Sequence, residues 1–392
     1  MTTTTQARMD LLPGEDEISV RESVSRICNS FGDGYQRAQY DAGKPLTGLW
    51  RALGEAGFLA ANLGEAWGGG GLGMTGMSWV IEECARSGNG GLSMIVSAGM
   101  AGTLLEAHGT PAQKQRWLPG IANGSLKFSF AITEPDAGTN SHNLRTEIRR
   151  HGDAYVLNGQ KTYCSGVEDA DAIMVVTRFR HADGKLGKHC LCIMDTSAPG
   201  YSHQPIKMPY VAAETSQSLF FDQVPIAADA IVGGEESGLR VVFDGLNPER
   251  IAVASVCVGT GFRALEKACN YARQRAVWGQ PIGAHQAIAH PLAKVRIELE
   301  AAKLLTQKAA TLWDARLPQA GEVSNMAKYA AAEAAVHAVD AAIQTHGGNG
   351  LANEYGVSDL WWLARLFRIA PVSAEMILNH VAQHSLGLPK SY

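Results

Sequence analysis

The sequence predicts an α+β protein of several domains, in which a small β domain lies between two helical regions. With 392 residues the chain exceeds the usual size of a single hydrophobic core, and 46% of its residues are apolar. The hydrophobic period changes from helical to strand-like after about residue 125 and returns to helical after about residue 235. We therefore expect an N-terminal all-α domain at 1–125, a middle β-barrel or β-sandwich at 126–235, and a C-terminal four-helix bundle at 236–392.

The first region contains three stretches with helical spacing, separated by Gly-rich or Pro-started turns: Leu46–Gly57, Met77–Ser87 and Leu92–His108. A glycine-rich run from Gly68 to Gly73 has the GxGxxG spacing of a nucleotide-binding turn. No predicted strand precedes it, and no acidic residue follows at the distance that a βαβ unit requires. We therefore interpret this run as a loop.

The middle region contains short strand-like runs between turns rich in Gly, Asp and Pro: Phe128–Ile132, Ala154–Leu157, Ala172–Arg178, His189–Ile193 and Ser218–Phe221. The last region returns to long helical patterns, which we expect to form an antiparallel bundle: Pro248–Gln274, Ala284–Ala315, Val323–His346 and Ser373–Leu386.

Composition excludes several classes of partner. The formal net charge is -4, and the sequence lacks a basic field or a nucleic-acid-binding motif, so nucleic acid is not an expected partner. Seven cysteines without a CxxC pair are typical of reduced core residues. The N-terminus lacks a signal-peptide pattern, and no uninterrupted apolar run reaches the length of about 18 residues needed to span a membrane. We therefore expect a cytoplasmic protein without a membrane anchor.

The segment Phe130–Asn140 carries the first functional signal. Thr133 precedes Glu134-Pro135, which favours an extended backbone, and the Ala-Gly that follows allows close approach to a ligand. The alternative is an ordinary β-turn with a solvated Glu134. The order of residues resembles the flavin-contacting segment of the acyl-CoA dehydrogenases, FAD enzymes that oxidise thioesters between Cα and Cβ. The resemblance implies flavin contacts from Phe130, Ile132, Thr133 and Thr139, with Thr139 also near the acyl-CoA phosphate.

A second segment, Asn158–Gly166, resembles the family's other flavin segment, an Asn-Gly hairpin followed by a strand. Strand alternation places Tyr163 and Ser165 on one face. The resemblance implies that Tyr163 covers the flavin ring and that Ser165 bonds near its N5 region. An Asn-Gly turn with a following aromatic residue is also common in β-sandwiches, and this structural interpretation stays open.

Two further segments resemble the family's site for the adenosine diphosphate half of FAD. Arg275–Gln286 contains an arginine, an aromatic residue and a glutamine that the resemblance assigns to FAD: Arg275, Trp278 and Gln286. An arginine fork suits a diphosphate. Gln344–Gly350 adds three more expected FAD ligands: Gln344, Gly347 and Gly348. A helix C-cap at Gly347 is the alternative. In the family these segments belong to a neighbouring subunit, which implies a homo-oligomer, a dimer or tetramer.

The catalytic base needs a separate argument. Many members of the family carry it on a Glu-Gly-Thr loop, and alignment without gaps places Pro371 at the Glu and Ser373 at the Thr. Proline cannot accept a proton. We retain Ser373 and the nearby Glu375 among the expected FAD-binding residues. Proline also lacks the backbone N–H that in the family helps to hold the thioester oxygen.

Members of the isovaleryl- and long-chain type carry the base on a bundle helix, one residue before an arginine. Glu249-Arg250 has this form, so the resemblance implies Glu249 as the base and Arg250 as a substrate-binding neighbour. The alternative is a solvated pair at a helix start, with Asn247 as cap and Pro248 in the first turn.

The resemblance covers essentially the whole chain. It implies an FAD-dependent enzyme of fatty acid metabolism that introduces a double bond into an acyl-CoA thioester and passes electrons to an electron-transfer flavoprotein. The alternatives are a flavin oxidase, reductase or monooxygenase of the same fold acting on an unusual substrate, and a non-catalytic acyl-CoA-binding paralogue.

Overall fold

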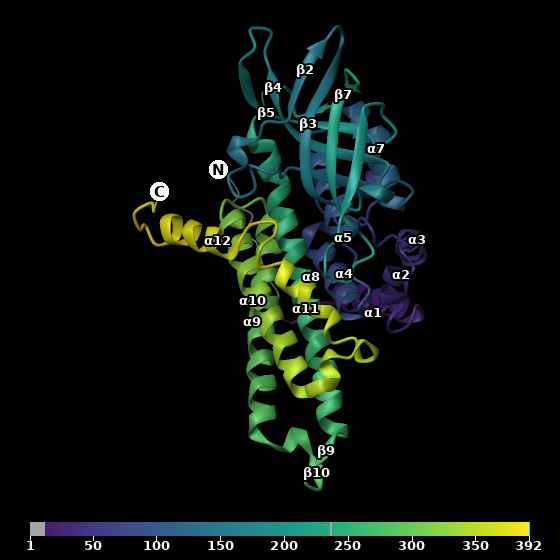
Figure 1. Cartoon of the computed structure of the whole chain (residues 1–392), viewed down its shortest axis with the longest axis vertical. Helices are drawn as coiled ribbons and strands as arrows, with labels where there is room; N and C mark the ends of the chain where they lie inside the picture. The colour runs from purple at the N-terminus through teal and green to yellow at the C-terminus, as the bar shows by residue number, and fades with distance from the viewer. Residues whose placement is uncertain (1–11, 236, 392) are drawn as a thin grey trace.

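The computed structural model describes residues 12–235 and 237–391, so the expected boundary residue 236 and the N-terminal residues 1–11 lie outside it. The sheet forms one end of the molecule and the long C-terminal helices extend from it, with the N-terminal helices packed alongside (Figure 1). The N-terminal elements are α1 (Glu15–Ser30), α2 (Tyr35–Asp41), α3 (Thr47–Glu55), α4 (Gly73–Arg86), α5 (Leu92–Met94), the π-helix η2 (Ile95–Gly102), α6 (Thr103–His108) and α7 (Pro111–Asn123).

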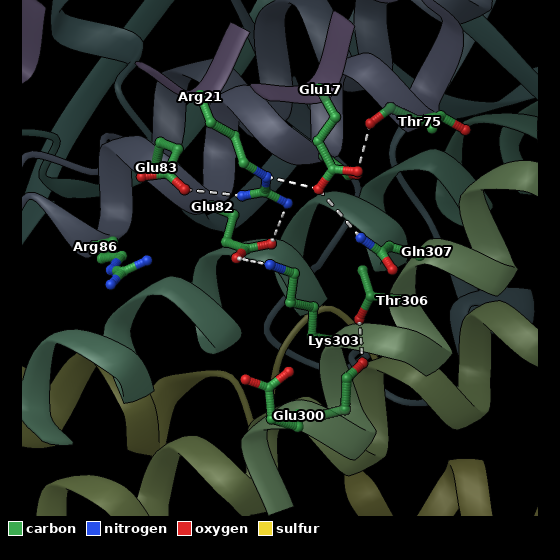
Figure 2. Close-up of polar contacts among 12 residues, drawn as sticks. Glu17, Arg21, Thr75, Glu82, Glu83, Arg86, Glu300, Lys303, Thr306 and Gln307 are labelled. Atoms are coloured by element: carbon green, nitrogen blue, oxygen red, sulfur yellow. Dashed lines mark hydrogen bonds and ion pairs between the residues drawn. The ribbon is translucent and has the colours of Figure 1, made fainter. Parts of the chain in front are cut away.

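A buried ion network joins the N-terminal helices to the bundle (Figure 2). Arg21 on α1 contacts Glu17 at 2.7 Å, Glu82 at 3.0 Å and Glu83 at 2.9 Å, the last two on α4. Lys303 on α9 contacts the other oxygen of Glu82 at 3.4 Å. Since each carboxylate has a cation beside it, the network links α1, α4 and α9 without an unpaired buried charge.

The predicted β domain is confirmed as a mostly antiparallel sheet with its own core. Its strands are β1 (Phe128–Ala131), β2 (Glu147–His151), β3 (Ala154–Ser165), β4 (Ala172–Arg180), β5 (Leu186–Asp195), β6 (Tyr201–Ile206), β7 (Ser216–Ile226) and β8 (Ile231–Val232). Among the described residues the order is β6-β7-β3-β2-β4-β5-β8, and β1 pairs in parallel with β4.

The expected turn at Asn158-Gly159 is wrong. β2 and β3 form the hairpin, with Gly152 and Asp153 between them, and β3 continues through Asn158 and Gly159. The pairing of β3 with β7 shifts register between Leu157 and Gly159. A Cβ on Gly159 would lie 2.6 Å from the Thr146 hydroxyl, and its φ is +141°. This glycine therefore serves a bulge in a strand that passes close to its neighbour, not a hairpin turn.

The last region contains α8 (Leu239–Gln274), the two-stranded ribbon β9 (Ala276–Val277) and β10 (Gln280–Pro281), α9 (Gln286–Asp314), α10 (Ala320–His346), α11 (Asp359–Leu366), α12 (Ala374–His380) and the π-helix η8 (Val381–Ser385). Helices α8, α9 and α10 pack against one another, and α4 and α11 pack beside them. The run expected as the fourth bundle helix, Ser373–Leu386, is helical, but it projects sideways from the bundle (Figure 1).

Helix α8 begins well before the predicted start at Pro248. Its first residue is Leu239, and the N–H of the preceding Gly238 donates to the His189 carbonyl on β5 at 2.9 Å. Pro248 therefore lies inside the helix, where it has no N–H for the helical ladder. The alternative in which Glu249 and Arg250 form a solvated pair at a helix start is thus wrong.

The π-helix η2 connects the sheet to α8. It packs against both β1 and α8, and the Ser97 hydroxyl accepts a hydrogen bond from the Phe128 N–H at 3.1 Å. On α8, a Cβ at Gly245 would lie 2.6 Å from Leu104, so this glycine permits close approach of α6. The first turns of α8 are therefore held close to the strand that leads into the Thr133 segment.

The cysteines and the membrane-spanning potential of the helices were the subject of two expectations from composition. All seven cysteines are free, and six of them are buried. Within residues 12–235 and 237–391, none of the helices combines the length and the apolar content needed to cross a bilayer.

Candidate active site

The turn after β1 is built around a buried ion pair. The Glu134 carboxylate is 7% exposed and lies 2.8 Å from the ammonium of Lys161, which is fully buried on β3. The same carboxylate accepts the N–H groups of Arg145 at 2.7 Å and Thr146 at 2.9 Å. Burial raises the pKa of Glu134, but Lys161 and these hydrogen bonds outweigh it and hold the pKa below its usual range. The alternative of a solvated Glu134 is wrong.

This ion pair fixes the backbone of the expected flavin segment. The Lys161 ammonium also donates to the Ile132 carbonyl at 2.8 Å, and the Thr162 N–H donates to the Thr133 carbonyl at 2.9 Å. Phe130 is buried on β1, while Thr139 is exposed at the far side of the turn. The site of a Cβ on Gly138 has no atom within 4 Å, so the turn presents an open surface to a ligand.

Tyr163 and Ser165 lie on the accessible side of β3, with Cys164 buried between them. Tyr163 is 61% exposed, has a φ of +57° and lies where the pairing with β7 shifts register, between Lys161 and Cys164. A positive φ at an aromatic residue is unusual, and a bulge is a device that turns a side chain away from its regular direction. The Ser165 carbonyl accepts a hydrogen bond from the Ser129 hydroxyl on β1 at 2.8 Å, so the strands of the two expected flavin segments are joined directly.

The residues expected to bind adenosine diphosphate lie at the other end of the chain's long axis. Arg275 and Trp278 follow α8 at the β9–β10 ribbon, and Trp278 is 88% exposed with a φ of +53°. Gln286 is exposed at the start of α9.

The end of α10 lies beside this ribbon. The rings of Tyr271 and His346 stack at 4.3 Å, which places the last turn of α10 against the last turns of α8. Gln344, Gly347 and Gly348 are exposed there. A Cβ on Gly347 or Gly348 would meet no atom within 4 Å, so the backbone is open to a phosphate. Gly347, with a φ of +60°, also serves as the helix C-cap, so both interpretations of the sequence apply to it.

The two groups of residues lie far apart within one chain. Helix α8 has 36 residues and is therefore about 54 Å long. It starts beside the sheet and ends at the ribbon (Figure 1). This separation is compatible with an FAD site shared between two chains, which the family resemblance implies.

The candidate base lies in the first half of α8. Glu249 is partly exposed, and burial raises its pKa to about 7, although the neighbouring cations Arg250 and Lys328 act in the opposite direction. A carboxylate with this pKa exchanges a proton near neutral pH, as a general base requires.

Arg250 is buried next to Glu249. One guanidinium nitrogen donates to the Asn247 side chain at 2.7 Å, while its Nε has no hydrogen-bond partner among the described residues. Burial lowers the pKa of Arg250 from its ordinary value, and Glu249 opposes this shift. A buried guanidinium N–H without a partner is costly and is available to a ligand.

Of the other expected residues, Ser373 caps α12, because its hydroxyl accepts the Met376 N–H at 3.3 Å, and Glu375 is exposed in the first turn of that helix. The sequence did not predict Lys328, which is fully buried on α10 and interacts electrostatically with Glu249. The sequence did contain a signal for this residue: Lys328 lies in an alanine-rich helix, on the face whose other residues are buried. A lysine on a buried face is uncommon.

Three domain families match the chain in the order that the fold shows. Residues 14–125 match the acyl-CoA dehydrogenase N-terminal domain, residues 129–224 its middle domain, and residues 236–386 its C-terminal domain. The chain therefore belongs to the acyl-CoA dehydrogenase family, and it is an FAD-dependent oxidoreductase.

Individual proteins of this family are similar to the chain over nearly its whole length. Acyl-CoA dehydrogenase FadE12 of Mycobacterium tuberculosis strain H37Rv is 49% identical over 97% of this chain and 98% of its own. A solved glutaryl-coenzyme A dehydrogenase in complex with glutaryl-CoA is 27% identical, with a TM-score of 0.88 over 98% of both chains. A glutaryl-CoA dehydrogenase of Mycobacterium smegmatis in complex with FADH2 has a TM-score of 0.89 at 22% identity over 97% of this chain and 96% of its own, which shows a likeness of fold.

Proposed function

We propose that this enzyme desaturates an acyl-CoA thioester between Cα and Cβ, with Glu249 as the base that removes the Cα proton. The observation that supports the proposal is the position of Glu249 inside α8, where desolvation raises its pKa to about 7 and the buried Arg250 lies beside it. In its ionised form Glu249 accepts the Cα proton, and the resulting neutral acid suits the same low-polarity surroundings.

Bound FAD would supply the acceptor for the hydride that leaves Cβ. Thr133, Thr139, Tyr163 and Ser165 would hold the flavin from one chain. The partner's exposed helix ends would hold the adenosine diphosphate through the residues that lie there: Arg275, Trp278, Gln286, Gln344, Gly347 and Gly348. The open positions next to Gly138, Gly347 and Gly348 support this assignment, because a ligand can approach their backbone closely.

Pro371 has no N–H, so position 371 supplies no hydrogen bond to the thioester oxygen. The unpartnered Nε of Arg250 is a donor in the neighbourhood of the base, which supports its role in binding the substrate. We further propose a homotetramer or dimer in the cytoplasm, an electron-transfer flavoprotein as the acceptor of the electrons, and a place in fatty acid metabolism.

The test is anaerobic bleaching of the flavin's visible band across a panel of linear, branched and cyclic acyl-CoAs. Glu249→Gln keeps the size of the side chain and removes the proton acceptor, so the reduction rate should fall by about 10²–10⁴-fold while the protein stays yellow. Glu55→Gln is the control, because Glu55 is exposed on α3, and it should reduce its flavin at the wild-type rate. Glu375→Gln tests the alternative position of the base. Bleaching of Glu249→Gln at the wild-type rate, with loss in Glu375→Gln, would place the base on α12. Rapid reoxidation of the reduced protein by oxygen would favour the oxidase alternative.

A further inference from the structure

We propose that Lys328 is a positioning residue for the reaction: it keeps the Glu249 carboxylate ionised and fixes the loop at 370–373 beside it. This inference rests on the proposed function, in which Glu249 is the base. Lys328 is assigned no direct contact with the substrate, and it acts through Glu249.

The geometry places Lys328 between α8 and the loop. Its side chain is fully buried on α10, and its ammonium donates to the Val372 carbonyl at 2.6 Å. Val372 directly follows Pro371, the residue aligned with the base of other members. The loop therefore has a buried cation as an anchor on the bundle.

The face of α10 that carries Lys328 packs on α8. A Cβ on Gly321 would lie 3.5 Å from the Asn247 side chain, so α10 starts beside the turn of α8 that precedes Glu249. Lys328 follows Gly321 by about two helical turns and hence lies on the same face. The Tyr271–His346 stack shows that the two helices remain side by side to their ends.

The charges around Lys328 identify Glu249 as its counterion. From α8 it faces Glu249, Arg250 and Cys257, and from its own helix Glu333. Burial raises the pKa of Cys257 to about 12, so this thiol is neutral at physiological pH. Glu333 is already paired with Arg368 at 2.6 Å. Of the two carboxylates near Lys328, Glu333 is therefore already bound to a cation. Glu249 has no hydrogen bond to a cation among the described residues.

The protonation states are compatible with this pairing. Burial lowers the pKa of Lys328 to about 8, so the ammonium is charged at pH 7. His380 on α12 faces Arg250, and burial lowers the pKa of His380, so it adds little positive charge at pH 7. A buried ammonium near a carboxylate favours the ionised carboxylate, and the effect is strong where water is scarce.

Removal of the positive charge should therefore raise the pKa of Glu249. In Lys328→Met the acid limb of the kcat/KM profile should move upward by about 1 pH unit, since a neighbouring buried charge alters a pKa by that order. Below the shifted pKa the rate should fall about tenfold, and it should recover at higher pH. A residue that only supports the fold would lower the rate equally at every pH.

The experiment compares pH profiles of flavin reduction in the FAD-loaded enzyme. Lys328→Gln keeps a donor but no charge and should shift the acid limb as Lys328→Met does, while Lys328→Arg keeps the charge and should restore the wild-type limb. Lys303→Met removes a bundle lysine beside another carboxylate, Glu82, and should leave the limb in place. An unshifted limb in the Met and Gln variants overturns the proposal, as does loss of the fold in both while Lys328→Arg folds.

The result for Glu249→Gln separates the two proposals. If that variant reduces its flavin at the wild-type rate, the proposed base is wrong. If it is inactive and the Lys328 variants keep the wild-type acid limb, the base stands and the role of Lys328 fails.

Discussion

Two carboxylates near the site lie in opposite electrostatic environments. Glu134 is paired with Lys161 and two backbone N–H groups, which hold its pKa below the usual range. Glu249 has neighbouring cations but no hydrogen bond of its own among the described contacts, and desolvation raises its pKa to about 7. The first is therefore suited to hold a turn in place, and the second to exchange a proton.

The pKa of Glu249 sets the expected pH dependence of the reaction. Because the base acts as a carboxylate, kcat/KM should rise with pH through about 7 and level off above it. The measurement is kcat/KM against pH with an artificial electron acceptor, in wild-type protein and in Glu249→Gln. A wild-type profile that is flat between pH 5 and 9 contradicts Glu249 as the base.

Glu134→Gln should destabilise the fold strongly. The substitution leaves the buried Lys161 ammonium without its counterion, and breaking a buried pair in this way costs about 3–5 kcal/mol. Chemical denaturation gives the free energy of unfolding. The pKa of Glu134 is lower in the folded state, so its contribution is present above the unfolded pKa and disappears as the pH falls through the folded pKa.

Glu147→Gln is the control, because Glu147 pairs with Arg180 in a partly exposed bridge on the same sheet. Its cost should stay below about 1 kcal/mol. Equal costs for the two variants would mean that burial of the Glu134–Lys161 pair has no special weight.

The sequence identified residues by their order in motifs, and it could not identify partners that come from distant segments. Glu249-Arg250 was found because the two residues are adjacent. Lys161 lies within the Asn158–Gly166 segment, yet its pairing with Glu134 depends on how β3 lies against the turn. Lys328 on α10 is separated from Glu249 on α8 by the ribbon and α9, and only packing of α10 on α8 brings them together.

At the level of elements, the helical period located the long helices and the strand period located five strands, since burial on one face imposes these spacings. The predicted ends of helices and strands depended on local sequence preferences, and tertiary packing overrode these preferences. Pro248 indicated a helix start, but α8 extends through it from Leu239. Asn158-Gly159 indicated a hairpin turn, but the strand continues through it with a bulge.

The bulge at Gly159 gives a prediction for β3. Gly159→Ala introduces a Cβ 2.6 Å from the Thr146 hydroxyl and 2.7 Å from its Cα, at a φ of +141°. The substitution should cost about 1–3 kcal/mol and weaken FAD binding, because β3 carries Tyr163 and Ser165. Thermal unfolding and the ratio of flavin to protein absorbance measure the two effects.

Gly152→Ala is the matched control in the β2–β3 turn, where φ is +62° and a Cβ meets no atom within 4 Å. It should cost only about 1 kcal/mol and leave FAD content unchanged. Similar FAD loss in both variants would indicate a general loss of stability instead of a displaced β3.

At the scale of the whole molecule, the length of α8 separates the two halves of the expected FAD site. The exposed Trp278 at the ribbon and Ile297 on α9, which is 71% exposed, are apolar side chains that a neighbouring subunit would cover. The sequence implied a shared site only through the family resemblance. The structure adds a physical reason, because Arg275 directly follows the 36-residue α8, whose other end lies beside the sheet that contains Tyr163.

Arg275→Ala should therefore weaken FAD retention and the oligomer together. A charged hydrogen bond to a diphosphate is worth about 1.5–3 kcal/mol, so the affinity for FAD should fall by about 10- to 100-fold. Bound FAD stabilises only the assembled state, so the variant should also dissociate at higher protein concentration than the wild type. Arg273→Ala is the control, because Arg273 is exposed in the last turn of α8, two residues before Arg275, and donates to Asn270 at 3.1 Å. FAD titration measures the affinity for the cofactor, and analytical ultracentrifugation measures the stability of the oligomer. If the variant loses affinity for FAD but its oligomer, with excess FAD present, is as stable as that of the wild type, the cofactor does not bridge two subunits.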